Sequence, residues 1–358
     1  MPISAMDCIT LAFEHTKRQL FNRFRFGQWV RLGFVGLLAG ELGTGGNVNF
    51  PSNGAQPSGL PGIGEIFHKI DPAILASVIT ILVITGIVLA VLMAYISSVM
   101  RFILFDSVLT RECRIRAGWN RRQEIGWKYF LWQLGLLLVS FAGAVVIIGI
   151  PAAFAYGMGW FQAPRLHLAQ LIVGGLLVLS LFVFFMIAVA LAHVFTKDFV
   201  VPQMAFEGIG AVEAWRRLWP MIEAEFKGYA LYIGMKIVLT IVAGIAIGIV
   251  TVILGLIIAV PVVGLVIAAV VASKGAGMTW NVFTITAAVA AACILFVIFF
   301  FLVSLITVPA IVFFPAYSIY FFAARYRPLS LALYSPAQQS AVPHGATPPF
   351  TPPPLPAT

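Results

Sequence analysis

Side chains able to take part in catalysis or metal binding are scarce in this chain. It has 13 acidic residues and five histidines among 358 residues. The sequence contains no HExxH, Walker or GxSxG motif, and Cys8, Cys113 and Cys293 form no CxxC pair or Cys/His cluster. We therefore predict no catalytic residue, no metal site and no cofactor, and expect a protein that is not an enzyme.

Three polar side chains lie within long apolar stretches, where a charge is costly and often functional. Lys236 lies well inside one stretch, either as a functional group or as a lysine that extends back to the membrane surface. His193 lies near the end of another, either as an interfacial histidine or as a proton relay. Arg31 lies in the first stretch, from which its side chain can also reach the surface. These three are the candidate intramembrane polar residues.

Two aspartates lie at comparable ends of apolar stretches, followed by related residues. Asp106-Ser107-Val108 precedes Trp119 and two arginines, and Asp198-Phe199-Val200 precedes Trp215 and two arginines. Helix capping or pairing with nearby basic side chains is one interpretation of the aspartates, and ion coordination is the other. Together with the N-terminal amphipathic segment described below, this recurrence indicates three units, each an interfacial helix followed by a membrane hairpin. The alternative is that any multi-pass protein with basic loops ahead of its spans shows this pattern.

Amphipathic segments precede the hairpins. In the clearest of them, Val212, Trp215, Trp219, Ile222 and Phe226 recur at helical spacing, with charged residues between them. A weaker form is Met6, Ile9, Phe13, Thr16 and Leu20. Such helices lie in the membrane interface, and we predict them near 5–22, 107–126 and 204–227. The candidate lipid contacts are Trp215, Trp219, Arg216, Arg217, Arg121 and Arg122.

The elements that position these residues are membrane spans. Apolar residues make up 61% of the chain and charged residues only 10%, far from the composition of soluble proteins. We predict an all-α, polytopic transmembrane helix bundle within residues 1–327, with about six spans. The spans are expected near 26–42, 72–105, 128–156, 168–195, 229–258 and 283–308.

The last two apolar stretches are too long for one straight crossing, and each contains proline. Pro261 divides the fifth, and Pro309 and Pro315 divide the sixth. We therefore expect each stretch to bend, break or project, which leaves six spans with broken ends or eight crossings in all. Gly36-x-x-x-Gly40 and Gly244-x-x-x-Gly248 permit close helix contact, within the chain or between copies, so the oligomeric state stays open.

Basic residues fall almost entirely on one side of these spans. Eighteen of the 22 Lys and Arg residues lie in the N-terminal segment up to Arg31 and at 101–128, 197–227 and 325–327. Only Lys69, Arg165 and Lys274 lie in the intervening connections. By the positive-inside rule, this distribution of basic residues predicts an inner-membrane protein with both termini on the cytoplasmic side. The net charge of +9 is then a property of the loops, and no nucleic-acid partner is expected.

The C-terminal segment has a different composition. Residues 328–358 end in TPPFTPPPLPAT and predict a disordered, proline-rich cytoplasmic tail. Such a tail can dock a protein partner that recognises polyproline, or remain unoccupied.

Three segments resemble a known group of proteins. They are FRFGQWVRLGFVGLL at 24–38, DFVVPQMAFEGIGAVEAW at 198–215 and PAIVFFPAYSIYFFAARYRPL at 309–329. They are similar to an uncharacterised family of bacterial multi-pass integral membrane proteins, which in turn resembles the membrane domain attached to some glycerophosphodiester phosphodiesterases. The resemblance implies a bacterial inner-membrane protein without a known active site.

Three functions are compatible with these patterns. The first is a non-enzymatic membrane protein that organises lipids or partner proteins at the inner membrane face through its amphipathic helices. The second is a transporter or permease-like subunit, for which broken helices would surround a polar site at mid-membrane. The third is a membrane-embedded lipid-modifying enzyme.

Overall fold

The computed structural model describes residues 4–22, 25–41, 72–275 and 282–334. All secondary structure in these ranges is helical, which confirms the all-α class. The elements, in chain order, are α1 (Asp7–Leu20), α2 (Phe26–Leu38), α4 (Pro72–Thr110), α5 (Ile115–Gly157), α6 (Leu168–Phe195), the π-helix η2 (Thr196–Val200), α7 (Val201–Glu207), α8 (Ala211–Ala224), α9 (Phe226–Gly275), α10 (Val282–Ala323) and α11 (Arg327–Tyr334).

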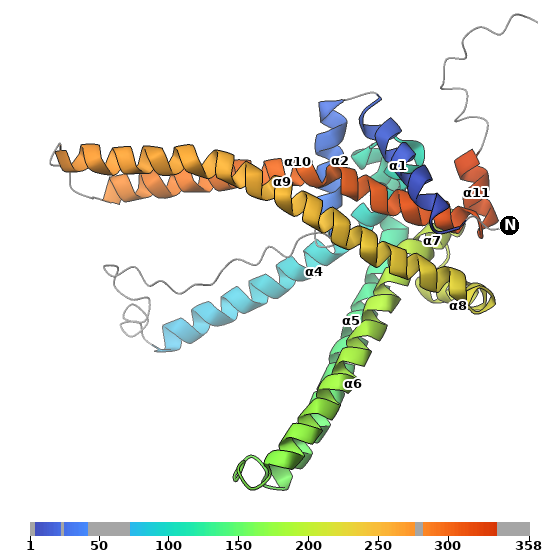
Figure 1. Ribbon diagram of the computed structural model, residues 1–358, viewed down its shortest axis with the longest axis horizontal. Coiled ribbons are helices and arrows are strands. Elements are labelled where there is room, and N and C mark those ends of the chain that lie inside the picture. The colour runs from blue at the N-terminus through green and yellow to red at the C-terminus, as the bar shows by residue number, and fades with distance from the viewer. Residues whose placement is uncertain (1–3, 23–24, 42–71, 276–281, 335–358) are drawn as a thin grey trace, which may run out of the picture.

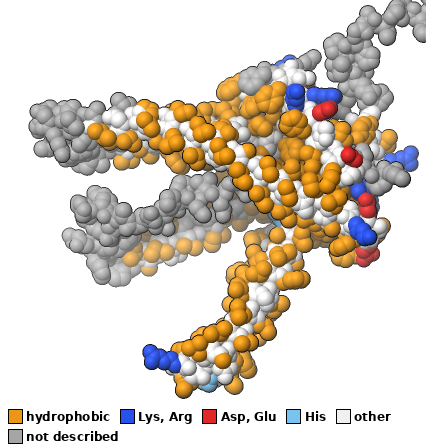
Figure 2. All heavy atoms as spheres, viewed as in Figure 1, with side chains coloured by type: hydrophobic (Ala, Val, Ile, Leu, Met, Phe, Trp, Pro, Cys, Tyr) orange, Lys and Arg blue, Asp and Glu red, His pale blue; other side chains and the backbone are white. Residues whose placement is uncertain are grey.

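The helices form three arms that diverge from one packed centre (Figure 1). The arms are α4 alone, the α5/α6 hairpin and the α9/α10 hairpin. The centre, here called the hub, consists of α1, α2, η2, α7, α8 and α11 with the adjoining ends of the five long helices. Most of the charged side chains in view gather over the hub, whereas the described parts of the arms are covered mainly by hydrophobic side chains, with basic groups at the tip of the α5/α6 hairpin (Figure 2).

Aromatic side chains fill the hub where α10, η2 and α9 meet. Phe199, Tyr232, Tyr317 and Phe321 are almost completely buried. The Tyr232 and Tyr317 rings are stacked with centroids 5.0 Å apart, and the Tyr232 and Phe321 centroids are 4.5 Å apart. Because each ring buries a large apolar area, this cluster fixes the hub ends of α9 and α10 against η2.

Five helices among the described residues are long and apolar enough to cross a membrane, and no residue of their most apolar segments is buried. We interpret these apolar surfaces as lipid-facing, because a helix with apolar side chains on all sides is stable in hydrocarbon. The first predicted span, 26–42, is a different case. Helix α2 has 13 residues and is about 20 Å long, short of the roughly 30 Å of the hydrocarbon layer. The described residues therefore contain five candidate spans rather than six.

The chain nevertheless reaches the far side before α4. Helix α2 begins beside the hub end of α4, where Gln28 Nε2 donates to Arg111 O at 2.7 Å. Pro72 lies at the opposite end of α4, a helix of 39 residues and about 58 Å. Residues 42–71, which connect α2 to α4 along the chain, lie outside the described residues. Both ends of the described chain then lie at the hub.

The proline breaks are not observed. Pro261 lies inside α9, and Pro309 and Pro315 lie inside α10, which continue through them. A proline removes one backbone donor, and a long helix in an apolar environment keeps its other bonds because it has no alternative partner.

Two of the three predicted interfacial segments contain separate short helices, and the third does not. Residues 5–22 contain α1, and residues 204–227 contain the end of α7 and all of α8. The segment 107–126 is not a separate helix. Residues up to Thr110 complete α4, Arg111 turns the chain with φ 60°, and α5 runs unbroken from Ile115.

The tail prediction needs a correction at its start. Residues 327–334 form α11, whose Leu329 is buried, because the helix docks on α10 and α7. Residues 335–358 of the predicted tail lie outside the described residues.

The two glycine motifs differ in use. A Cβ on Gly36 would lie 2.5 Å from Ile311 Cγ2, so α2 approaches α10 through this glycine. Gly40 has φ +77° and serves the turn after α2. Gly248, in the second motif, is exposed and has no neighbour within 4 Å. Gly36 therefore serves close packing within the chain, and Gly248 does not.

Candidate functional site

A cluster of buried charges lies where α2, α4, η2 and α9 meet in the hub. Asp198 accepts a hydrogen bond from Tyr232 Oη at 2.9 Å and forms an ion pair with Lys236. Lys197, the preceding residue, forms an ion pair with Glu41. Arg101, on α4, donates through Nη2 to Ala39 O at 2.7 Å. We call these five charged residues the hub charge cluster.

The π-helix η2 positions the centre of this cluster. Pro202, at the start of α7, has no N–H to donate to the carbonyl of Asp198, four residues before it. The wide turn Thr196–Val200 lies directly before that proline, and such turns occur often at functional sites. Within this turn, Lys197 is directed to α2 and Asp198 to α9.

A small cavity of about 30 Å³ lies inside the hub charge cluster. Glu41, Arg101, Lys197, Asp198 and Ser318 contribute its polar lining, together with apolar residues of α4, α7 and α10. The volume is sufficient for one small solute of about the size of a water molecule.

The cavity lining carries charges of both signs. Arg101 and Lys197 are cations, Glu41 and Asp198 are carboxylates, and Lys236 pairs with Asp198 from outside the lining. Arg101 is 7% exposed, and its Nε and Nη1 have no hydrogen-bond partner within the part of the chain that the structure describes. Burial alone would raise the pKa of Glu41, but Lys197 and Arg101 beside it hold that pKa below its ordinary value.

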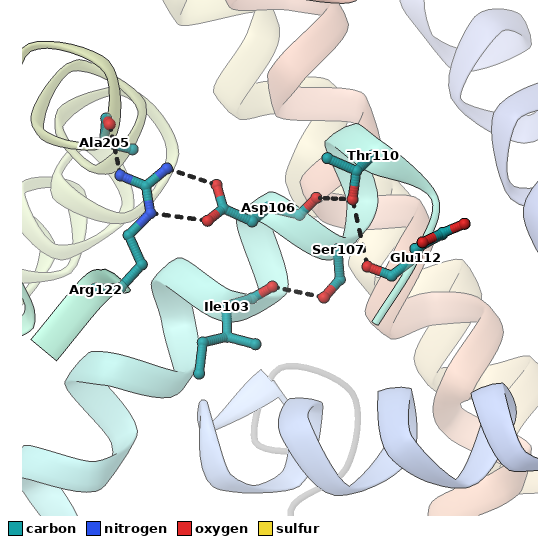
Figure 3. Close-up of polar contacts among 7 residues, drawn as sticks. All are labelled: Ile103, Asp106, Ser107, Thr110, Glu112, Arg122 and Ala205. Atoms are coloured by element: carbon teal, nitrogen blue, oxygen red, sulfur yellow. Dashed lines mark hydrogen bonds and ion pairs between the residues drawn. The ribbon is translucent and has the colours of Figure 1, made fainter. Parts of the chain in front are cut away.

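A second buried ion pair joins α4, α5 and α7 (Figure 3). Arg122 donates through Nε and Nη2 to the two carboxylate oxygens of Asp106, both at 2.8 Å, and through Nη1 to Ala205 O at 2.6 Å. Asp106 and Asp198 thus both pair with basic side chains. Arg122 is 7% exposed and fully engaged, so its assignment as a lipid contact is corrected to a structural role.

A groove of about 370 Å³ lies on the outside of the hub, between α4, α5 and α6. Its polar lining residues are Gln133, Ser140, His193 and Thr196, and the remainder of its lining is apolar or aromatic. Trp132 Nε1 and Trp215 Nε1 approach Thr196 Oγ1 at 3.4 and 3.0 Å. His193 therefore opens into a surface groove, separate from the cluster that contains Lys236.

The other predicted residues are distributed around the hub surface. Arg31, Arg121 and Arg216 are exposed, and Arg217 pairs with Glu207 and Glu213. On α8, Trp215 packs inward while Trp219 is 57% exposed, because the buried face is made by Ala211, Ala214 and Leu218. The predicted aromatic row is thus divided between the hub and the outside.

The partners within the hub charge cluster could not be identified from the sequence. Glu41, Arg101 and Lys197 were not predicted as a site, because they are more than 50 residues apart along the chain. The one available signal was Lys236, whose cost inside an apolar stretch implied a buried partner.

His15, on the hub face of α1, is a buried histidine with both ring nitrogens engaged. Its Nε2 lies 3.0 Å from Val108 O, and its Nδ1 lies 3.2 Å from Tyr320 Oη. Because a carbonyl only accepts, Nε2 carries the proton and Nδ1 accepts from the tyrosine. Burial, with a smaller contribution from Arg111, lowers the pKa of His15 to about 4.

This histidine makes the stability of the protein depend on pH. The unfolded chain takes up the proton at a pKa of about 6.5, whereas the folded chain does so only near 4. Between these values stability falls as pH falls, with a total loss of about 3 kcal/mol, and it is constant above pH about 6.5. We expect the His15→Gln variant to lose this part of the pH dependence in unfolding measurements from pH 4.5 to 7.5. An identical slope in both proteins would refute the assignment.

The fold and the exposed apolar arms define the class, a multi-pass helical membrane protein. A family model described as "Family of unknown function (DUF7544)" matches residues 3–332, and the chain belongs to this family. No curated protein and no solved structure matches the chain.

Proposed function

We propose that this is a non-enzymatic membrane protein that binds and organises lipid at the inner membrane face. The groove between α4, α5 and α6 is the observation that carries the proposal. Its volume lies in the range of sites that hold small molecules, and its predominantly apolar lining suits a lipid chain.

The order of residues along the groove supports an amphipathic occupant. Helix α5 leaves the hub and α6 returns to it, so Gln133, His193 and Thr196 lie at the hub end. Leu137 and Val189 line the part further out, together with Ser140, whose hydroxyl donates to Leu136 O at 2.6 Å. The polar lining residues other than Ser140 thus lie at the hub end, which matches a lipid whose headgroup region lies beside the hub.

Unpartnered apolar side chains on the hub surface point to the same membrane face. On α8, Val212 and Trp219 are 62% and 57% exposed; Phe13 on α1 and Met6, directly before α1, are 64% and 58% exposed. These helices pack on the hub through one face and present apolar groups on another, as expected of helices at the headgroup level. A protein partner on these helices or on the C-terminal tail is an alternative that affinity purification from membranes would reveal.

The lipid proposal is tested by filling the groove. Ala94 lines it, and we expect Ala94→Trp to lose most of the lipid that the wild-type protein retains in native mass spectrometry from mild detergent. Ala90→Trp is the matched control, because Ala90 lies on α4 one turn nearer the arm tip and outside the groove lining. Equal lipid retention in both variants would reject the groove as the binding site, and retention of a peptide instead would favour a protein partner.

The orientation is also a proposal, supported by the basic residues of the hub and the positive-inside rule. In a cysteine-free background, Val212→Cys should react with a membrane-impermeant maleimide only after the inner face is opened. Gln162→Cys, in the exposed α5/α6 connection, should react in intact cells. The reverse pattern would place the hub outside the cell.

Two further hypotheses from the sequence are the transporter function and the relationship to a known membrane domain. The transporter hypothesis loses the support it took from broken helices, since α9 and α10 continue through their prolines. The relationship to the membrane domain attached to some glycerophosphodiester phosphodiesterases stays a proposal. A structure of such a domain with the same hub and three arms would support it, and an unrelated helix order would reject it.

A further inference from the structure

The lining of the groove between α4, α5 and α6 indicates which class of lipid suits it, given the lipid-binding function proposed above. The lining residues include no Asp, Glu, Lys or Arg. We infer that the groove selects an uncharged lipid whose polar end forms hydrogen bonds, such as a diacylglycerol or an isoprenoid quinone, over phospholipids with a charged headgroup.

The first support is the hydrogen-bonding state of the polar lining groups. The hydroxyls of Ser140 and Thr196 donate to backbone carbonyls one turn earlier, and Gln133 bonds with two neighbouring side chains. His193 is exposed in the groove, and its ring has no hydrogen bond or ion pair within the part of the chain that the structure describes. A neutral imidazole offers one donor and one acceptor, so His193 is available to a hydroxyl or carbonyl group of a ligand.

The second support is charge complementarity. A phosphodiester within the groove would bring a negative charge into mainly apolar surroundings, where it is costly without a cation. Lys197, which follows Thr196 in the chain, is directed into the hub and paired with Glu41, and it does not line the groove. The lining therefore offers no cation to a phosphate, whereas an uncharged polar end needs none.

The third support is depth in the membrane. On α5, Trp127 is 51% exposed, and Lys128 forms an exposed ion pair with Glu124. Tryptophan and charged side chains favour the headgroup level, and no charged residue follows Lys128 in α5. The headgroup level on this arm therefore lies near Lys128.

His193 lies deeper than this level. Helices α5 and α6 run antiparallel, and the contact between Trp132 and Thr196 sets their register. His193, three residues before Thr196, is then level with Gly135, three residues after Trp132. This position is about 10 Å beyond Lys128 along the arm. A phosphate at the headgroup level does not reach His193, whereas an uncharged polar end is able to lie at that depth.

The test uses the full chain, freed of lipid in mild detergent, with an equimolar mixture of three probes. The probes are dioleoylglycerol, decylubiquinone and dioleoylphosphatidylglycerol, which differ in the chemistry of their polar ends. We expect native mass spectrometry to show at least one neutral probe bound about tenfold more than the phosphatidylglycerol. The neutral probe that binds more tightly separates a diacylglycerol from a quinone. Equal or stronger binding of the phosphatidylglycerol would overturn the inference.

Two histidine variants locate the polar end of the lipid. His193→Leu should weaken binding of the preferred neutral probe by about three- to tenfold, the effect of losing one hydrogen bond. His167→Leu is the matched control, because it makes the same change at the opposite end of α6, outside the groove lining, and it should leave binding unchanged. Unchanged binding in His193→Leu, or an equal loss in both variants, would overturn the inference.

The Ala94→Trp variant separates this inference from the lipid proposal on which it rests. If phosphatidylglycerol is the probe that binds and Ala94→Trp removes it, the inference is overturned and the lipid proposal stands. If Ala94→Trp leaves the binding of all three probes unchanged, both are overturned, because Ala94 lines the groove.

Discussion

Replacing Lys236 with leucine is expected to lower the free energy of unfolding by about 3–5 kcal/mol, the usual cost of stranding a buried charge. The side chains of Lys236 and Asp198 are 13% and 3% exposed. Without the lysine, Asp198 keeps only the Tyr232 hydroxyl as a partner within the contacts described for it. Unfolding by SDS in mixed micelles measures this loss.

A double variant separates a stranded charge from lost packing. In Asp198→Asn/Lys236→Leu no charge is left unpaired, and the asparagine still accepts from Tyr232, so most of the lost stability should return. Arg18→Leu is the control for an ion pair in water, since Arg18 and Glu14 are 60% and 56% exposed, and should change stability by less than about 1 kcal/mol. A double variant as unstable as Lys236→Leu would contradict the pairing.

Gly36→Leu should lower the free energy of unfolding by about 1–3 kcal/mol or prevent assembly of the hub. Any Cβ at this position would lie 2.5 Å from one atom and 2.7 Å from another atom of the Ile311 side chain, so α2 must move away from α10. Thermal unfolding in nanodiscs measures the loss. The combination Gly36→Ala/Ile311→Val, which restores some space, should be less damaging than Gly36→Leu.

Gly248→Leu is the matched control for this prediction. It makes the same change in a helix, at a glycine with no neighbour within 4 Å. The substitution should be neutral or slightly stabilising, because leucine favours helix more than glycine does. Equal losses at the two positions would mean that helix propensity rather than close packing explains the effect of Gly36→Leu.

The sequence predicted the helical class well because lipid-compatible composition permits little else. The number of spans was less accessible. A stretch of about 44 apolar residues was expected to break, on the assumption that apolar side chains face lipid. In α10, however, Val312 and Phe321 are buried in protein while Ile294 and Val297 are exposed. The same apolar sequence serves lipid along the arm and protein core in the hub, and composition does not distinguish the two.

The site was less predictable than the fold, for a related reason. Lys236 was recognisable because a charge inside an apolar stretch is energetically costly, and Asp198 because it follows a span. No local pattern in the sequence linked the two residues. Their pairing depends on how α9 crosses η2, a long-range arrangement of the hub. The amphipathic rhythm of α8 was recognisable, yet it did not reveal that Trp215 faces the hub while Trp219 faces outward, because both residues lie near the boundary between the two faces.

The divergence of the three arms from a single hub gives the molecule a tapered outline, narrow where the helices converge and wide at the arm tips (Figure 1). A protein that keeps this outline in a bilayer displaces more area in one leaflet than in the other. Such a protein is sensitive to the curvature of the bilayer that surrounds it.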